Sequence, residues 1–329
     1  MVIKMENNSN RISLGIDVGG TKLAVGLVDE SGKLLAKNIV YDHVDKNEED
    51  LIRHIYLLSD DLLRENSLAI TDIDSVGLCF PGHIRFKEGV VVTTSNLNGF
   101  KNYPLRKKLE EHFGTKVVID NDANCQAYGE YKFGAGRGFD DVIFITVSTG
   151  IGGGIIINNK LYRGLTGTAG EFGHMIIEHS SESACTCNNK GCWMACSCGM
   201  FLNRAVKKHL ENGVKSDLIT IDDINSGKLD GQMIRLGLDR KDKLCETVVS
   251  EYADYIGTGL NNIFQIFNPP IVIMGGGLMK LGEEFLNQIR KNFTKRVKGM
   301  MHDEMLIRLT ELDGNAGVIG AAAIAMNEK

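Results

Sequence analysis

A histidine and three cysteines form the clearest set of candidate metal ligands in this sequence. They are His174, Cys185, Cys187 and Cys192, in the order H-x10-C-x-C-x4-C. One imidazole nitrogen and three thiolates suit a tetrahedral Zn²⁺ whose four protein ligands leave no place for an activated water, so we expect a structural ion. The alternative is a group of free thiols, but five of the eight cysteines lie between positions 185 and 198, a density that is unusual without metal in a reducing compartment. Cys196 or Cys198 could replace one of the ligands.

Three glycine-rich turns, each directly after an apolar strand, are candidates for binding an anion through backbone N–H groups. They are Asp17–Lys22, Ser148–Gly154 and Met274–Leu278. Singly, each could be an ordinary β-turn, but three together favour a nucleotide. Neither GxxxxGK[ST] nor GxGxxG occurs in the sequence, so the P-loop and the dinucleotide fingerprint are disfavoured. In the first turn, Asp17 could hold Mg²⁺ while Thr21 and Lys22 approach phosphates.

A candidate catalytic carboxylate follows the apolar strand expected at residues 116–119. Three polar residues end this strand: Asp120, Asn121 and Asp122. Asp and Asn are also favoured helix N-caps, and on spacing alone a cap is at least as good an interpretation of Asp122 as a catalytic base. Cys79 and Cys125 are isolated among apolar residues, so we expect both to be buried thiols without a chemical role.

The elements that must position these residues follow from the apolar pattern. The spacing predicts strands at 12–17, 23–28, 76–80, 116–119, 142–147, 155–157 and 271–274, and helices at 48–65, 104–113 and 252–267. Residues 178–190 and 211–230 are expected to be loops. The strand–glycine–strand pattern of residues 14–28 recurs at 142–157, which indicates two related folding units.

Composition narrows the class of protein. At 329 residues the chain is long enough for about two domains. Its 43% hydrophobic and 24% charged content is that of a soluble globular protein. With 37 basic against 42 acidic residues the net charge is −5, so we expect no nucleic-acid or membrane partner. Met1–Arg11 is polar, and the apolar run Ala316–Met326 is too short to span a bilayer, which favours the cytoplasm.

From about Leu14 to Ala325 these motifs resemble the ROK family of repressors, uncharacterised open reading frames and sugar kinases, within the hexokinase, actin and chaperone ATPase superfamily. Three further stretches contribute to the resemblance: Asn121–Asn124, Gly164–His174 and Gly314–Gly320. The resemblance implies an α/β, two-lobed, actin-like ATPase (ribonuclease H-like) fold with a nucleotide cleft between the lobes. It implies a smaller lobe of residues 1–121 completed by the C-terminal helix 315–329, and a larger lobe of residues 122–314 that includes the zinc-binding loop.

The same resemblance implies ATP-dependent phosphorylation of a sugar hydroxyl, such as the 6-hydroxyl of glucose or of an N-acetylhexosamine, with Asp122 accepting the proton. The implied ATP and Mg²⁺ contacts are Asp17, Gly19, Gly20, Thr21, Lys22, Thr149, Gly150, Gly275, Gly276 and Gly277. The implied sugar contacts are Gly82, Asn96, Asn121, Asp122, Glu171 and His174. Family members also commonly form homodimers or homotetramers.

The sequence departs from the family pattern beside the metal ligands. A glutamate that contacts sugar hydroxyls normally follows the last zinc cysteine by two residues, and Met194 occupies that position. Ser95 and Ser148 replace a common proline and a common glycine. Family repressors have an added N-terminal DNA-binding region, for which a strand that starts by residue 12 leaves no room. The other alternative, suggested by Met194, is a catalytically weak sugar-binding regulator without such a region.

Overall fold

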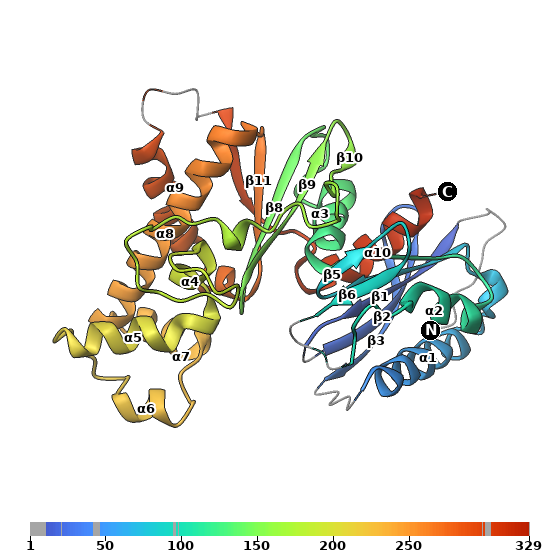
Figure 1. Cartoon of the computed structure of the whole chain (residues 1–329), viewed down its shortest axis with the longest axis horizontal. Helices are drawn as coiled ribbons and strands as arrows, with labels where there is room; N and C mark the ends of the chain where they lie inside the picture. The colour runs from blue at the N-terminus through green and yellow to red at the C-terminus, as the bar shows by residue number, and fades with distance from the viewer. Residues whose placement is uncertain are drawn as a thin grey trace. The chain divides into compact units, whose positions relative to one another are not determined.

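The computed structural model describes residues 11–20, 22–41, 47–94, 97, 99–297, 299 and 304–328. The chain forms two compact units (Figure 1). The first contains residues 1–144, 154–170 and 310–329, and the second contains residues 145–153 and 171–309. The first unit therefore includes residues 122–144, which the predicted lobe boundary assigns to the larger lobe. The predicted lobes, residues 1–121 with 315–329 and residues 122–314, remain a prediction.

A five-stranded sheet organises the first unit, in the order β3-β2-β1-β4-β7. Its strands are β1 (Ile12–Val18), β2 (Lys22–Asp29), β3 (Leu34–Tyr41), β4 (Ser75–Phe80) and β7 (Val117–Asn121). The first three strands are antiparallel neighbours, whereas β4 is parallel to both β1 and β7. The carboxyl ends of β1, β4 and β7 therefore lie at one edge of the sheet. A separate hairpin pairs β5 (His83–Arg85) with β6 (Val90–Thr93).

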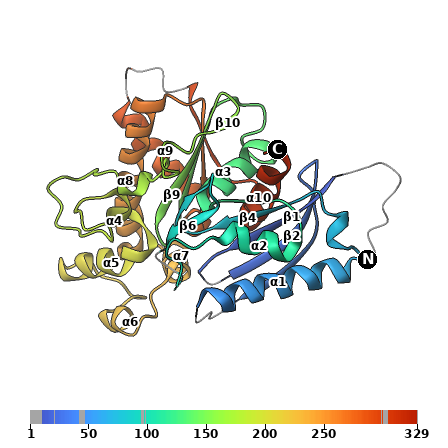
Figure 2. The same cartoon turned by 45° about the vertical axis from the view of Figure 1, so that its right-hand side comes forward.

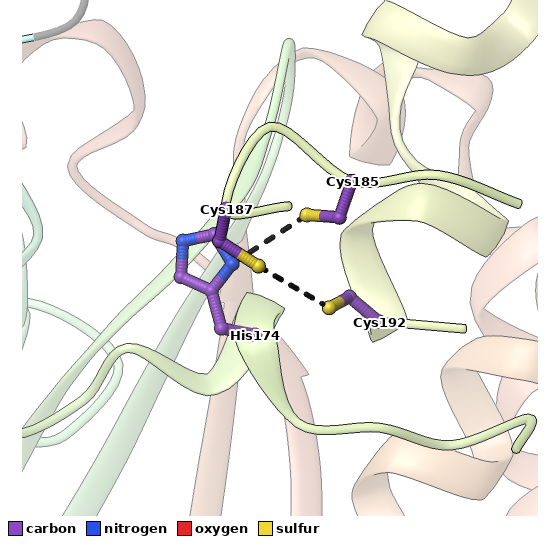
Figure 3. Close-up of side chains that lie close together, drawn as sticks. All are labelled: His174, Cys185, Cys187 and Cys192. Atoms are coloured by element: carbon purple, nitrogen blue, oxygen red, sulfur yellow. Dashed lines mark hydrogen bonds between the residues drawn. The ribbon is translucent and has the colours of Figure 1, made fainter. Parts of the chain in front are cut away.

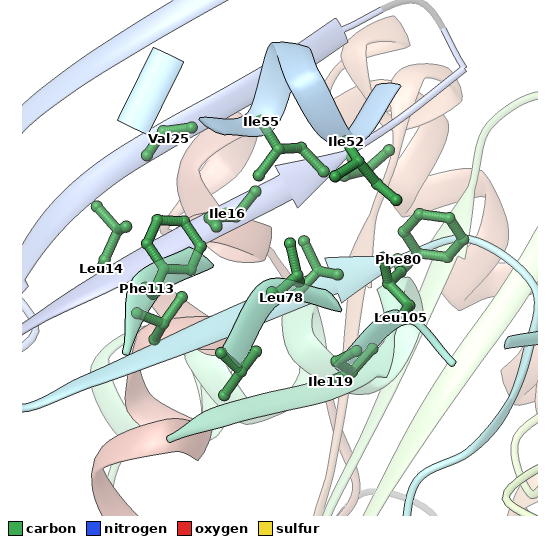
Figure 4. Close-up of a cluster of buried hydrophobic side chains, with 14 of the residues drawn as sticks. Leu14, Ile16, Val25, Ile52, Ile55, Leu78, Phe80, Leu105, Phe113 and Ile119 are labelled. Atoms are coloured by element: carbon green, nitrogen blue, oxygen red, sulfur yellow. The ribbon is translucent and has the colours of Figure 1, made fainter. Parts of the chain in front are cut away.

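One face of this sheet is covered by α1 (Glu48–Glu65) and α2 (Leu105–Phe113) (Figure 2). The apolar periodicity of residues 48–65 predicted α1 with its observed bounds, and Asn47 caps it by accepting a hydrogen bond from the Asp50 backbone. Alternate residues of the strands point into this core, together with apolar residues of both helices (Figure 4). The drawn residues include Leu14, Ile16, Ile55, Leu78 and Phe113.

The opposite face is covered by α3 (Asp122–Phe133) and α10 (Ala316–Asn327). Residues Ala316–Met326 of α10 are all buried, as expected for a helix that is apolar on every side. The helix approaches the sheet closely because the pairing aligns Gly26, Gly15 and Gly77 in a row across three strands. A Cβ on Gly15 would lie 2.1 Å from the Val318 carbonyl oxygen, and one on Gly77 would lie 2.0 Å from that of Ala321. Only glycine leaves room for the helix backbone at these positions.

The second unit is mainly helical. Its α-helices are α4 (Trp193–Ser197), α5 (Leu202–Glu211), α6 (Ile221–Asn225), α7 (Gly231–Asp239), α8 (Lys243–Phe267) and α9 (Glu283–Arg296). Helix α8 is central: Asp242 caps its start, and α9 packs along it. Trp193 is fully buried against it, where a Cβ on Gly259 would lie 2.3 Å from the indole ring. This contact fixes α4, the short helix that directly follows the last candidate metal ligand.

A second five-stranded sheet has the order β10-β9-β8-β11-β12. Its strands are β8 (Val142–Val147), β9 (Ile151–Ile157), β10 (Lys160–Leu161), β11 (Ile271–Gly275) and β12 (Leu306–Leu309). In both sheets three consecutive strands are followed by a fourth and a fifth from later in the chain. The repeated order agrees with the two related folding units that the sequence predicts.

The structure corrects three predicted elements. Strand β9 begins at Ile151 rather than 155, so Gly152–Gly154 belong to a strand, and the close approach of Gly154 to α3 explains the glycine: a Cβ there would lie 2.4 Å from that of Ala127. Helix α8 begins at Lys243, nine residues before the predicted start at 252, because Asp242 provides a cap. Helix α6 interrupts the loop predicted at 211–230, where Thr220 and Asp223 form a capping box.

No helix in the described part of the chain has both the length and the apolar character needed to cross a bilayer.

Replacement of one of the three aligned glycines, Gly26, Gly15 and Gly77, tests whether they set the position of α10. Gly77→Ala should lower the free energy of unfolding by about 1–3 kcal/mol, because the new methyl group forces α10 away from the sheet. The change is measured from the urea unfolding midpoint of the first unit. The matched control is Gly231→Ala in α7, where a Cβ meets nothing within 4 Å. An equal effect of the two substitutions would show that the aligned glycines do not set the position of α10.

Candidate functional site

The carboxyl ends of β1, β4 and β7 bring together residues from three distant parts of the sequence. In the strand register Asp17 is opposite Cys79, and Cys79 is opposite Asp120. The Cys79 Sγ lies 3.1 Å from Asp17 Oδ1 and 3.9 Å from the backbone oxygen of Asp122. The two candidate carboxylates, of Asp17 and Asp122, thus belong to residues that contact the same buried thiol.

The Asp17 carboxylate is 15% exposed and lies at the turn between β1 and β2. Its Oδ2 is 3.2 Å from the Lys22 ammonium, which also donates to the Gly314 carbonyl. The turn is closed by a hydrogen bond from Gly19 N–H to the Lys22 carbonyl, and Gly20 is exposed beside it. A Cβ on Gly317 would lie 2.7 Å from the Asp17 carboxyl carbon, so the start of α10 packs directly against this carboxylate.

At the junction of β7 and α3, the side chains of Asn121 and Asp122 both accept from Ala123 N–H, each at 2.9 Å. Asn121 is the N-cap: its Oδ1 accepts a hydrogen bond from Ala123 N–H at 2.9 Å. Asp122 is the first residue of the helix, with a partly exposed side chain. The Asn121 amide also donates to the Gly82 carbonyl at 3.1 Å, which places two predicted sugar contacts side by side. Asp120 is buried, so Asn121 and Asp122 are the accessible pair of the three.

The four candidate metal ligands gather within the second unit (Figure 3). The nitrogen of His174 and the sulfurs of Cys185, Cys187 and Cys192 all lie within 4.8 Å of one another. Cys196 and Cys198 are not part of this group of four. His174 directs Nδ1 at the Cys185 sulfur, 3.6 Å away, and Nε2 toward a carboxylate oxygen of Glu171, 3.9 Å away. One ring nitrogen of His174 therefore faces the thiols, and the other faces Glu171, which is a predicted sugar contact.

The thiols of this cluster differ in proton affinity. A hydrogen bond from the Asn189 backbone is the main cause that lowers the pKa of Cys187 to about 6, so this residue favours the thiolate that metals bind. Burial raises the pKa of Cys192 to about 12. Burial also raises the pKa of Cys196 and of Cys198 to about 11, which keeps both as neutral thiols.

The second and third glycine turns lie next to each other in the second unit. A Cβ on Gly276 would lie 2.4 Å from the Val147 carbonyl oxygen, and one on Gly277 would lie 3.5 Å from Ser148 Oγ. The Thr149 carbonyl accepts a hydrogen bond from Met200 N–H at 2.9 Å, which orients the turn through Gly150. Met194 is buried, and its terminal methyl carbon would lie 3.5 Å from a Cβ on Gly150.

The predicted site residues thus form local groups. In the first unit Asp17, Gly19, Gly20 and Lys22 share one turn, and Gly82, Asn121 and Asp122 share one corner. In the second unit Glu171 lies near the metal ligands, and Thr149 and Gly150 lie near Gly275–Gly277. Thr21 and Asn96 lie outside the described residues. Sequence reasoning missed the contact between Cys79 and Asp17, and it gave no reason to single out Arg163, which pairs with Asp120.

The fold and this arrangement define an α/β protein of the two-lobed, actin-like ATPase class. The chain belongs to the ROK family, whose model matches residues 13–328. It is 33% identical over 317 residues to a glucokinase of Streptomyces coelicolor, covering 95% of this chain and 97% of that protein. A ROK family glucokinase from Streptomyces griseus, solved in complex with glucose and AMPPNP, is 34% identical, with a TM-score of 0.79 over 96% of this chain and 99% of that one. The predicted family and fold class are confirmed.

The family resemblance extends to regulators. The xylose repressor of Bacillus subtilis is 29% identical over 328 residues, which cover 99% of this chain and 80% of the repressor.

Proposed function

We propose that this protein is an ATP-dependent sugar kinase that phosphorylates a hydroxyl of a hexose such as glucose or an N-acetylhexosamine. The main support is the corner where β1, β4 and β7 end, with Asp17 and Asp122 both in contact with Cys79. Carboxylates at two strand ends on the same edge of a sheet, those of β1 and β7, can serve two tasks of phosphoryl transfer: the neutralisation of phosphate charge and proton acceptance. Likeness to a glucokinase solved with glucose and AMPPNP supports the same activity.

Asp122 is the proposed base. Phosphoryl transfer depends mainly on alignment and charge neutralisation, and a positioned carboxylate completes it by accepting the hydroxyl proton. Asn121 caps α3 by accepting from Ala123 N–H, and Asp122 Oδ1 accepts from the same N–H at 2.9 Å, which holds this carboxylate at the start of the helix. The other proposed sugar contacts are Gly82, Asn96, Asn121, Glu171 and His174.

Asp17 is the proposed carboxylate for Mg²⁺. Its position fits that role, because it is largely buried at a strand end with Lys22 at 3.2 Å and with glycines on both the turn and α10. When bound, Mg²⁺ supplies positive charge to the phosphate oxygens. The proposed nucleotide contacts are Gly19, Gly20, Thr21 and Lys22 in the first unit, and Thr149, Gly150, Gly275, Gly276 and Gly277 in the second.

We propose Zn²⁺ as the ion for His174, Cys185, Cys187 and Cys192. A set of one nitrogen and three sulfurs within 4.8 Å fits its tetrahedral coordination. His174 would bind through Nδ1, since that atom faces the thiols, and would leave Nε2 to orient Glu171. Zinc is therefore proposed to hold His174 and Glu171, two of the proposed sugar contacts, in place.

Met194 bears on the identity of the sugar. It is buried beside the Ser148–Gly150 turn, and it replaces a carboxylate that, by family resemblance, contacts sugar hydroxyls. A thioether cannot provide the hydrogen bonds that a pair of hydroxyls requires. A sugar with an apolar or acylated group at that position would match this chain better than glucose.

Replacement of the proposed base is a direct test of catalysis. Asp122→Asn should lower kcat by roughly 10²–10⁴, the usual effect of losing a general base, without changing the melting temperature. Turnover is measured as ADP release with Mg-ATP and the best sugar. Asp50→Asn is the matched control, because Asp50 also lies in the first turn of a helix, α1, but away from the strand ends. Near-normal turnover of the Asp122 variant would refute the assignment.

Metal content tests the zinc proposal. We expect elemental analysis to find about one zinc per chain, and chelation to abolish sugar phosphorylation together with the order of residues 171–192, because zinc stabilises a site of this kind by roughly 10–16 kcal/mol. Cys187→Ser should lose the ion. Cys196→Ala should retain it, because Cys196 lies outside the group of four. A metal-free protein with full activity would contradict the proposal.

A substrate screen tests both the kinase and the role of Met194. Purified protein with Mg-ATP is assayed against glucose, fructose, allose, N-acetylmannosamine, N-acetylglucosamine and polyols. Met194→Glu should raise kcat/KM for glucose by about tenfold or more, the effect of one hydrogen bond to a charged group, whereas Met194→Leu should keep the wild-type preference. Measurable sugar affinity without turnover on any sugar would favour a sugar-binding regulator, the activity class of the xylose repressor.

A further inference from the structure

We propose that Arg163 is a positioning residue for the candidate catalytic segment, acting through Asp120 and itself oriented by Glu328. The inference rests on the proposed role of Asp122. All four residues belong to the first unit, and none of the three supporting residues is among the predicted contacts of ATP, sugar or metal.

Asp120 uses both carboxylate oxygens inside the protein. Its Oδ1 accepts from Asn121 N–H and from the Asn124 side-chain amide, each at 2.8 Å. Its Oδ2 accepts from Arg163 Nε at 2.6 Å. Both donors to Oδ1 belong to the β7–α3 junction, one before Asp122 and one after it. The rotation of this carboxylate therefore determines the orientation of the backbone that presents Asp122.

Arg163 is held from two other sides. Its Nη2 donates to a Glu328 carboxylate oxygen just beyond α10, and its guanidinium lies over the Phe86 ring, 4.4 Å from the centroid. The Arg163 side chain is 11% exposed and that of Asp120 is 4% exposed. Burial lowers the pKa of Arg163, but the charges of Asp120 and Glu328 outweigh it and raise the pKa overall, so the guanidinium stays charged. A planar guanidinium with two anchored edges can fix the Asp120 carboxylate in one orientation.

A buried ion pair can simply be structural, so the test must separate positioning from stability. Removing Arg163 alone leaves a buried, uncompensated carboxylate and is expected to destabilise the first unit strongly. Removing both charges restores stability, because a neutral pair has no such penalty. It does not restore the fixed orientation of the side chain at position 120, because no charged partner then holds its rotation.

The experiment compares Arg163→Met with the double variant Asp120→Asn/Arg163→Met. We expect the single variant to have a lowered melting temperature, and the double variant to regain most of it. In the double variant, kcat should still be about 10- to 100-fold below wild type, the cost of a misplaced reacting group. The KM for ATP should change by less than about twofold, because Arg163 pairs with Asp120 and Glu328, whereas Asp17 pairs with Lys22. Recovery of kcat together with stability would overturn the proposal.

Substitution of Glu328 should lower the stability less than substitution of Arg163, because the Glu328 side chain is 36% exposed. Glu328→Gln should lower kcat severalfold with little change in melting temperature. The matched control is Arg11→Met: Arg11 likewise pairs with an aspartate, Asp74, and contacts the end of α10 at the Met326 carbonyl, but it lies before β1. Equal kcat losses in the two variants would show a general effect of the C-terminal helix and would contradict a role specific to Arg163.

Amide hydrogen exchange makes the test independent of catalysis. In the double variant the Asn121 and Ala123 amides should exchange faster than in wild type, while the amides in the middle of α10 should be unchanged. If the wild-type protein phosphorylates no sugar, the proposed kinase function fails, but this exchange pattern still decides whether Arg163 orders the junction. Unchanged exchange at residues 121–124 would refute the positioning role under either outcome.

Discussion

The close contact between α10 and the first sheet is the constraint on which the candidate site depends. Gly15 and Gly77 let the helix backbone approach two strands at distances that exclude a Cβ, and the alignment of these residues follows from the strand register. The same helix begins with Gly317 against the Asp17 carboxylate. The strand ends, the Asp17 turn and the helix start are thus parts of one packing arrangement, and a shift of α10 would move all three.

Buried carboxylates fix the position of α3, in the same way that closely packed glycines fix the position of α10. Glu130 is fully buried, and its carboxylate accepts hydrogen bonds from Ala135 N–H at 2.9 Å and from Leu312 N–H at 2.8 Å. Residues 310–312 lead from β12 to α10, so this carboxylate joins the end of α3 to the segment that leads into the other helix. Asp120 satisfies the start of α3 in the same way. A buried carboxylate is stable only when its oxygens are paired, so each one specifies a single arrangement of the segments around it.

The sequence predicted the features that depend on neighbouring residues. The bounds of α1, the strands before the glycine turns and the gathering of four ligands over residues 174–192 all follow from short-range patterns. The contact of Cys79 with Asp17 spans 62 positions, and that of Arg163 with Asp120 spans 43, so no local pattern could reveal them. The glycines at 152–154 look like a turn in the sequence, but they belong to β9, where Gly154 permits close packing on Ala127.

The caps of α6 and α3 differ in how well the sequence predicts them. Thr220 with Asp223 is a recognisable capping signal, and it marks α6 inside the expected loop. At the β7–α3 junction Asn and Asp are equally good caps, so the sequence could not assign the role. The backbone conformation decides it, because Asn121 is extended and Asp122 is already helical.

The repeated sheet order allows the turns and junctions of the two sheets to be compared position by position. By position in the two sheets, the Asp17–Lys22 turn corresponds to the Ser148–Gly150 turn, and the junction before α3 corresponds to the one before α10. The first turn has a carboxylate and a lysine, whereas the second has no charged side chain and only hydroxyls and backbone groups. The junction before α3 has Asp122, whereas the one before α10 has Asp313 and Gly314, and the Gly314 carbonyl accepts from Lys22. The two turns thus differ in charge: Mg²⁺ binding is expected at the first, which has Asp17 and Lys22, while the equivalent turn of the second sheet is suited to anion contacts through N–H groups.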